Sequence, residues 1–210
     1  MINTIYRLVS PKLFEEVYDE VDLNDKVVVR PTHQSICQAD QRYYNGSRDP
    51  EILKEKLPMA LIHEGIGEVI FDDTDTFKTG DLVVIIPNTP REKDEVIAEN
   101  YLRSSKFRAS GFDGFMQDYI VSSPERLVKL PNDINKEVAS FTELISVAHH
   151  SIIRFANKSH KRKEVIGVWG DGNLGYISSL LLKITFPKSR VIVFGKNDEK
   201  LNLFSFADDV

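Results

Sequence analysis

VIGVWGDGNLGYISSLLLKITFPKSRVIVFGK, residues Val165 to Lys196, is the stretch that decides the fold. Its first five residues form an apolar run typical of a buried strand, and Gly170-Asp171-Gly172-Asn173-Leu174-Gly175 follows at once as G-x-G-x-x-G. Apolar residues then recur at helical spacing as far as Pro187, and Val191 to Phe194 indicates a second strand. A glycine motif between a strand and a helix is the context that a dinucleotide-binding βαβ unit requires.

The glycines and the helix behind them predict a site for a nucleotide pyrophosphate. Gly170 permits the tight turn, Gly172 lets the backbone approach a phosphate, and Gly175 lets the helix pack closely on the strand. The helix N-terminus, at Asn173 and Leu174, offers free N–H groups and the positive end of the helix dipole. The alternative is a glycine-rich turn in an α/β protein that binds no ligand, but the presence of both strands and the helix around the motif favours the nucleotide site.

The end of the second strand predicts which nucleotide binds. NAD-type sites carry an Asp or Glu there, roughly 20 residues after the glycines, to hold the ribose 2′-hydroxyl. This strand ends instead in Gly195 and Lys196, a small residue followed by a cation. That pair leaves space and charge for a 2′-phosphate, so NADP(H) is favoured over NAD(H). Two observations argue against this preference for NADP(H). A lysine such as Lys196 is also typical of a solvated loop, and Asp198 lies two residues further along the sequence.

Composition narrows the class of protein. The 210 residues are 41% hydrophobic and 28% charged, which is ordinary for a soluble protein with a sizeable core. The net charge of −5 indicates no general affinity for nucleic acid or for a membrane surface. The single cysteine, Cys37, excludes an internal disulfide and a four-cysteine zinc site. No run is long enough to span a bilayer and the N-terminus lacks a signal-peptide core, so we expect a cytoplasmic location.

The part before the nucleotide unit is mostly β in character. Short strands are predicted at residues 2–9, 26–30, 66–71, 82–86, 115–121 and 126–130, a spacing typical of a small barrel or sandwich. Residues 87–114 form a polar excursion between them. One helix is predicted over residues 135–156, with an apolar face made of Val138, Phe141, Leu144, Ile145, Ala148 and Ile152.

The nucleotide unit itself is short. From residue 164 onward the sequence holds one β-α-β and the start of another helix. A complete doubly wound domain has two such halves. We therefore expect the chain to be cut short within this domain.

Several stretches together resemble the zinc-dependent medium-chain dehydrogenase/reductases. They are Ser35–Asp40 (SICQAD), Leu57–Val69 (LPMALIHEGIGEV), Gly80–Val84 (GDLVV), Gly114–Tyr119 (GFMQDY) and Thr142–Leu144 (TEL). Within that family the sequence is most similar to the ribulose-5-phosphate reductases. The stretches that carry this second likeness are Ser35–Arg48, Asn88–Pro90, Ala98–Leu102 and Trp169–Gly175.

The resemblance implies a fold and its division into domains. Residues 1–140 would form a GroES-like β-barrel catalytic domain, and residues 141–163 a connecting helix and linker. Residues 164–210 would form the first part of a Rossmann domain, an incomplete parallel sheet. Family membership also implies a metal site in the cleft between the two domains.

The resemblance implies one catalytic zinc, with Cys37, His63 and Glu143 as ligands and Glu64 as an alternate or supporting ligand. Thiolate, imidazole and carboxylate are ligands that zinc accepts. Each residue also has an ordinary interpretation: a small buried cysteine, a histidine packed at a strand edge, or an acid at a helix N-terminus. The second, structural zinc of many relatives is not expected, because residues 87–114 contain no cysteine.

The reaction implied is the reduction of D-ribulose 5-phosphate to D-ribitol 5-phosphate, with hydride from NADPH and a carbonyl polarised by zinc. Arg42 and Arg48 are the candidate ligands of the substrate phosphate. Ala39 departs from the Ser or Thr that many relatives use to pass the proton. The implied partners are a sugar phosphate, a second copy of the chain, and a cytidylyltransferase of the same wall or capsule pathway. Two alternatives stay open: a zinc polyol dehydrogenase acting on an unphosphorylated sugar, and a non-catalytic protein that binds a nucleotide or a partner chain.

Overall fold

The structure is a computed structural model that describes residues 1–210. The chain divides into two compact units, Met1–Glu143 and Leu144–Val210, and each is described by itself. None of the helices combines the length and the apolar character that crossing a membrane requires.

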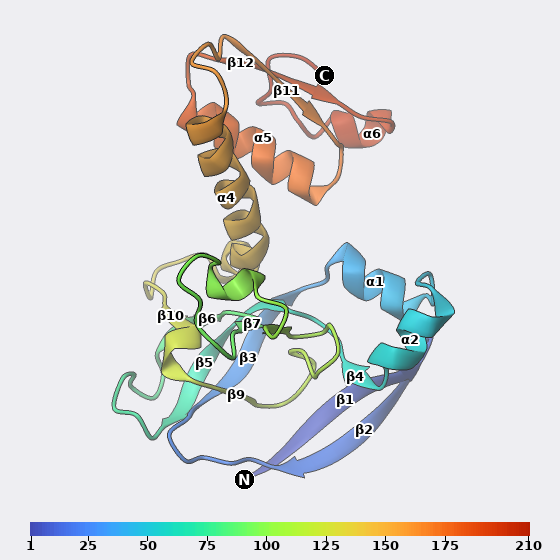
Figure 1. Cartoon of the computed structure of the whole chain (residues 1–210), viewed down its shortest axis with the longest axis vertical. Coiled ribbons are helices and arrows are strands. Elements are labelled where there is room, and N and C mark those ends of the chain that lie inside the picture. Colours follow the sequence, from blue (N-terminus) through green and yellow to red (C-terminus); the bar gives the residue numbers. More distant parts are fainter. The chain divides into compact units, whose positions relative to one another are not determined.

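Two antiparallel sheets, besides a short two-stranded one, form most of the larger unit (Figure 1). The first has five strands in the order β10 (Leu127–Lys129), β6 (Leu82–Ile85), β5 (Glu64–Asp72), β3 (Val27–Ser35) and β9 (Ile120–Ser122). The second has three strands in the order β2 (Leu13–Glu20), β1 (Ile2–Ser10) and β4 (Met59–Ala60). This architecture confirms the predicted GroES-like, β-rich fold.

The core of the larger unit is filled by side chains from both sheets. Val27 and Val29 point to the same face of β3, because side chains alternate along a strand, and both are fully buried. They belong to one apolar cluster with Leu8 of β1, Met59 of β4 and the ring of Phe115. Both sheets therefore contribute side chains to this cluster.

The helix predicted over residues 135–156 is in fact two helices, α3 (Lys136–Ala139) and α4 (Thr142–Lys158). Hydroxyl groups at the break explain it: the Ser140 hydroxyl donates to the carbonyl of Glu137, and the Thr142 hydroxyl donates to that of Ala139. Such bonds compete with continued helix. The predicted apolar face is therefore wrong at its start, where Val138 is 57% exposed.

Two predicted strand boundaries are also wrong. β3 continues past Pro31 to Ser35, and its register with β5 shifts between Pro31 and His33. A bulge of this kind accommodates a residue that has no N–H to donate. β9 begins only at Ile120, because the N–H of Phe115 is bonded to the carbonyl of Ile62 instead of to a neighbouring strand.

Several short elements of the larger unit were not predicted. Besides β2 and β4, they include the helices α1 (Gln38–Tyr44) and α2 (Pro50–Lys56). The polar excursion contains β7 (Asn88–Thr89), which pairs with β8 (Lys106–Phe107), and 3-10 turns cover Glu99–Tyr101 and Pro124–Arg126.

The smaller unit contains the predicted βαβ. Strands β11 (Val165–Trp169) and β12 (Arg190–Phe194) are parallel, and α5 (Asn173–Thr185) connects them (Figure 1). Leu182 of α5 packs against Ile166 and Val191 on one face of this sheet. A short helix, α6 (Asp198–Leu201), follows β12.

Candidate metal centre and nucleotide site

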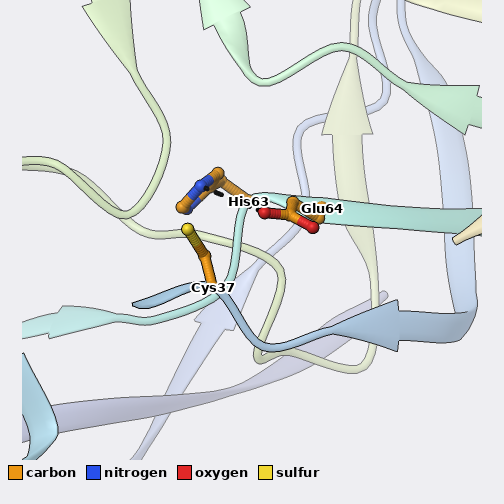
Figure 2. A group of neighbouring side chains, drawn as sticks. All are labelled: Cys37, His63 and Glu64. Carbon is orange, nitrogen blue, oxygen red and sulfur yellow. Dashed lines mark ion pairs between the residues drawn. The ribbon is translucent and has the colours of Figure 1, made fainter. Parts of the chain in front are cut away.

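Cys37, His63 and Glu64 come together in the larger unit, and one potential ligand atom from each lies within 4.8 Å of the other two (Figure 2). Strand pairing causes this. Ser35, near the end of β3, pairs with Glu64 at the start of β5, so the residues that follow one strand meet those that begin the other. Figure 2 shows the Cys37 sulfur directed at the imidazole of His63.

The imidazole of His63 is buried and incompletely bonded. Its Nε2 lies 3.9 Å from Oε1 of Glu64, and its ring meets the ring of Phe107 edge to face, with 5.3 Å between the centroids. Its Nδ1 is buried without a hydrogen-bond partner, and Oδ1 of Asp40, at 3.8 Å, is too far away to accept from it. A buried ring nitrogen without a partner is costly in a folded protein unless something else occupies the site.

Asp40 fastens together the two segments that carry the cysteine and the histidine. Its side chain is buried, and its two oxygens accept from different segments. The backbone N–H of Cys37 donates to Oδ2 at 3.0 Å, and the backbone N–H of Ile62 donates to Oδ1 at 2.9 Å. Bonds to a carboxylate are stronger than neutral ones, so Asp40 fixes the spacing between Cys37 and His63.

The backbone just before His63 is strained. Ile62 has φ of 69°, the left-handed region that a β-branched residue rarely adopts. Its surroundings hold it there, since the N–H of Phe115 donates to the Ile62 carbonyl at 2.7 Å. Gly114 makes this approach possible, because a Cβ on it would lie 2.3 Å from the same oxygen. Strain of this kind persists where the surrounding structure over-determines it, often at functional sites.

Glu64 influences the protonation of Cys37. The Ser35 hydroxyl donates to Oε2 of Glu64 at 2.5 Å, which leaves Oε1 facing His63. Burial raises the pKa of the Cys37 thiol, and the charge of Glu64 raises it further, while a hydrogen bond from the Ala39 N–H acts in the opposite direction. Without a cation the thiolate is disfavoured here, whereas a metal ion would reverse that preference.

Glu143, which the resemblance implies as the third zinc ligand, is not one of the three clustered side chains, whereas Glu64, the implied alternate, is. Glu143 is nevertheless close enough to Glu64 to be affected by it. Burial, and then the charge of Glu64, raise the pKa of the Glu143 carboxyl to about 7. The site therefore places two acids and a thiol in a poorly hydrated region with no side-chain cation among them.

These residues fit a small divalent cation. Zinc bonds of about 2.0 to 2.3 Å place two ligands of a tetrahedral ion about 3.5 Å apart, so the cluster has to contract by about 1 Å around it. Sulfur, nitrogen and oxygen are all represented, and three protein ligands leave the fourth position open, as in catalytic zinc sites.

The glycine turn has the geometry that the sequence predicts. Gly170 has φ of +145°, and a Cβ on Gly175 would lie only 2.0 Å from the Gly170 carbonyl oxygen. At Gly172 a Cβ would meet nothing within 4 Å, so the space beside it is open. Gly172 precedes α5, and no side chain caps that helix. Open space beside free helix N–H groups suits a pyrophosphate.

Gly195 and Lys196 lie directly after β12, as predicted, and a carboxylate that was not predicted is there too. The backbone N–H groups of Lys196 and Asn197 both donate to Oδ2 of Asp171, at 2.7 and 2.9 Å. Asp171 stands between the first two glycines of the motif. In the sequence, the available signal for this contact was a charged residue between two glycines.

The two arginines proposed for a phosphate differ in their surroundings. Arg42 is exposed on α1. Arg48 follows α1, and its guanidinium lies over the Tyr43 ring, 4.4 Å from the centroid. Its Nε is buried and has no hydrogen-bond partner. Of the two, Arg48 has the unsatisfied donor.

Known proteins resemble this chain over nearly all of its length. Residues 24–132 match the alcohol dehydrogenase GroES-like domain. The chain is 63% identical over 209 residues to a ribulose-5-phosphate reductase of Bacillus spizizenii, covering 99% of this chain and 61% of that protein. It is 57% identical to ribulose-5-phosphate reductase 1 of Staphylococcus aureus, covering all of this chain and 62% of that protein.

Among solved structures, the crystal structure of S. aureus TarJ in complex with NADPH superposes with a TM-score of 0.83 at 48% identity. That superposition covers the whole chain and 59% of TarJ. The chain thus spans about three-fifths of the length of these relatives. Its fold, its GroES-like domain and these relatives confirm the resemblance found in the sequence. The chain therefore belongs to the medium-chain dehydrogenase/reductase family, and ribulose-5-phosphate reductases are among its relatives.

Proposed function

We propose that the protein takes part in the NADPH-dependent, zinc-assisted reduction of D-ribulose 5-phosphate to D-ribitol 5-phosphate. The observation that carries the proposal is the cluster of Cys37, His63 and Glu64 within 4.8 Å, in a chain 63% identical to a reductase of that name. The product would be consumed by cytidylyl transfer, so a cytidylyltransferase is the partner enzyme that the proposal implies.

Cys37, His63 and the Oε1 atom of Glu64 would hold the zinc, and Glu143 would supply an alternate carboxylate. Bound zinc acts as a Lewis acid that polarises a substrate carbonyl. The chain's own contribution is geometric and electrostatic. Asp40 fixes the spacing between the cysteine and histidine segments, and Ser35 holds one oxygen of Glu64 so that the other faces the site. A cation there also offsets the mutual repulsion of Glu64 and Glu143.

The glycine turn would hold NADPH, which supplies the hydride. The open space at Gly172 and the uncapped start of α5 would receive the pyrophosphate, contacting the N–H groups of Asn173 and Leu174. The ammonium group of Lys196 would contact the 2′-phosphate. The NADPH complex of TarJ supports this choice of nucleotide.

Arg48 would contact the phosphate of the sugar, with Arg42 as a more exposed second cation. The buried, unpartnered Nε of Arg48 supports this role, because a phosphate oxygen would satisfy it. Stacking on Tyr43 holds the guanidinium plane in place. An unphosphorylated sugar would not need either arginine.

The test is NADPH oxidation by the chain with D-ribulose 5-phosphate, with and without added zinc, using a full-length relative as the positive control. We expect oxidation that depends on zinc and that Arg48→Ala weakens through KM. Equal rates with D-ribulose, unchanged by Arg48→Ala, would favour a polyol dehydrogenase. A chain that takes up no zinc and oxidises no NADPH with any ketose phosphate would favour a non-catalytic protein.

A further inference from the structure

Asp171 crosses from the glycine turn to the end of β12. Its Oδ2 accepts both the Lys196 N–H, at 2.7 Å, and the Asn197 N–H, at 2.9 Å. Gly195 makes room for this contact, because a Cβ there would lie 2.7 Å from the Cβ of Asp171 and 2.8 Å from Oδ2. The carboxylate and the missing side chain at Gly195 thus fit each other.

The turn and the strand end are joined at more than one point. Besides the two bonds to Asp171, the Gly170 N–H donates to the carbonyl of Phe194 at 2.8 Å. Beside that bond, the rings of Trp169 and Phe194 stack with 4.8 Å between centroids. The glycine turn and the end of β12 are therefore held together, and Asp171 supplies the only ionised link between them.

The charge of Asp171 strengthens this link. Hydrogen bonds from the N–H groups of Lys196 and Asn197 lower the pKa of the Asp171 carboxyl, and the nearby ammonium of Lys200 acts in the same direction. The carboxylate is thus ionised at neutral pH. Bonds from N–H groups to a carboxylate are stronger and more directional than neutral ones.

The consequence concerns the 2′-position of the nucleotide, which proteins of this fold recognise at the end of the second strand. Asp171 already occupies the two backbone N–H groups there. A 2′-phosphate can therefore contact only side-chain cations. One of these is Lys196, whose backbone N–H is bonded to Asp171. We propose that Asp171 is a positioning residue that fixes Lys196 for contact with a 2′-phosphate and so sets the preference for phosphorylated nucleotides. This inference rests on the NADP(H) specificity proposed above.

The test measures binding of two probes that differ only in the 2′-phosphate, adenosine 2′,5′-bisphosphate and 5′-AMP, by calorimetry on the full chain. We expect Asp171→Ala to weaken the bisphosphate about fivefold, the value of one exposed ion pair, and to change 5′-AMP by less than about twofold. Asp171→Asn keeps an acceptor oxygen and should restore most of the loss. Asp198→Ala removes the same charge nearby without touching these N–H groups, and serves as the matched control.

A second variant and a second readout keep the test independent of folding defects. Gly195→Ala places a methyl group against Asp171 and should reproduce the selective loss. Amide hydrogen exchange at Lys196 and Asn197 should accelerate in Asp171→Ala and in Gly195→Ala, and should not change in Asp198→Ala.

Three results would overturn the inference. The first is equal weakening of both probes, which would indicate a purely structural role. The second is a preference for the bisphosphate that survives Asp171→Ala, which would contradict the role of Asp171 alone. The third is a wild-type chain without any such preference, which would contradict the proposed cofactor and with it this inference.

Discussion

Replacing Asp40 by alanine is the sharpest test of how the candidate metal site is built. The carboxylate accepts from Ile62 N–H at a buried position and from Cys37 N–H at a partly buried one. Asp40→Ala leaves both donors without a partner. An unsatisfied buried donor costs about 1 to 3 kcal/mol, so we expect a loss of about 3 kcal/mol in the free energy of unfolding of the larger unit. Asp40→Asn keeps one acceptor oxygen and should lose less.

The matched control is Asp49→Ala. Asp49 also accepts a backbone N–H, that of Glu51 at 2.9 Å, but at the exposed start of α2. Loss of such a cap costs about 1 kcal/mol. Urea unfolding of the metal-free chain, followed by far-ultraviolet circular dichroism, measures both variants. Fluorescence of Trp169, the single tryptophan, reports on the smaller unit and should not change.

Zinc affinity gives an independent readout of the same change. Because Asp40 acts through the spacing of the ligands, Asp40→Ala should weaken zinc about 10- to 100-fold, the usual effect of removing a supporting residue. Competition with a chromophoric chelator measures it. An Asp40→Ala chain that is destabilised no more than the Asp49→Ala chain, and that binds zinc as tightly as the wild type, would contradict this role of Asp40.

Three further predictions concern the glycine turn, the nucleotide and pH. Gly175→Ala puts a Cβ 2.0 Å from the Gly170 carbonyl oxygen, so it should destabilise the smaller unit by about 1 to 3 kcal/mol and abolish binding of adenosine 2′,5′-bisphosphate; unchanged Trp169 fluorescence melting would contradict this. Lys196→Ala should weaken NADPH about fivefold and leave NADH unchanged in fluorescence titrations, and equal effects on the two would refute the 2′-phosphate contact. The folded-state pKa of Glu143, about 7, exceeds the unfolded value of 4.5, so the folded metal-free chain binds the proton more tightly. The stability of the metal-free chain should therefore fall as pH rises from 4.5 to 7, and Glu143→Gln should flatten that slope. A slope that the substitution leaves unchanged would argue against a raised pKa of Glu143.

The smaller unit could be predicted well from sequence because its signals are local. The apolar run ending at Trp169, the glycines and the helical spacing before Pro187 each act over a few residues. The predicted strand Val165–Trp169 agrees with β11, and the predicted helix agrees with α5. Asp171 was missed because its partners, Lys196 and Asn197, are distant in sequence and are joined to it only by the fold.

The larger unit was harder to predict, for physical reasons visible in particular residues. β2 has no buried side chain to create an alternating pattern, and α1 and α2 are too short to show helical periodicity. The candidate ligands Cys37 and His63 rested on the family resemblance. Which glutamate lies beside them depends on the pairing of Ser35 with Glu64, a long-range register that no local pattern encodes.

The central claim is that the sulfur of Cys37 binds a metal ion together with His63 and Glu64. Cobalt(II) in place of zinc makes this directly visible, because a thiolate bound to cobalt gives an intense near-ultraviolet charge-transfer band and tetrahedral cobalt gives strong visible bands. We predict both bands at one cobalt per chain in the wild type, and loss of the charge-transfer band in Cys37→Ser. A cobalt-loaded chain without these bands, or with a spectrum that Cys37→Ser leaves unchanged, would contradict the account.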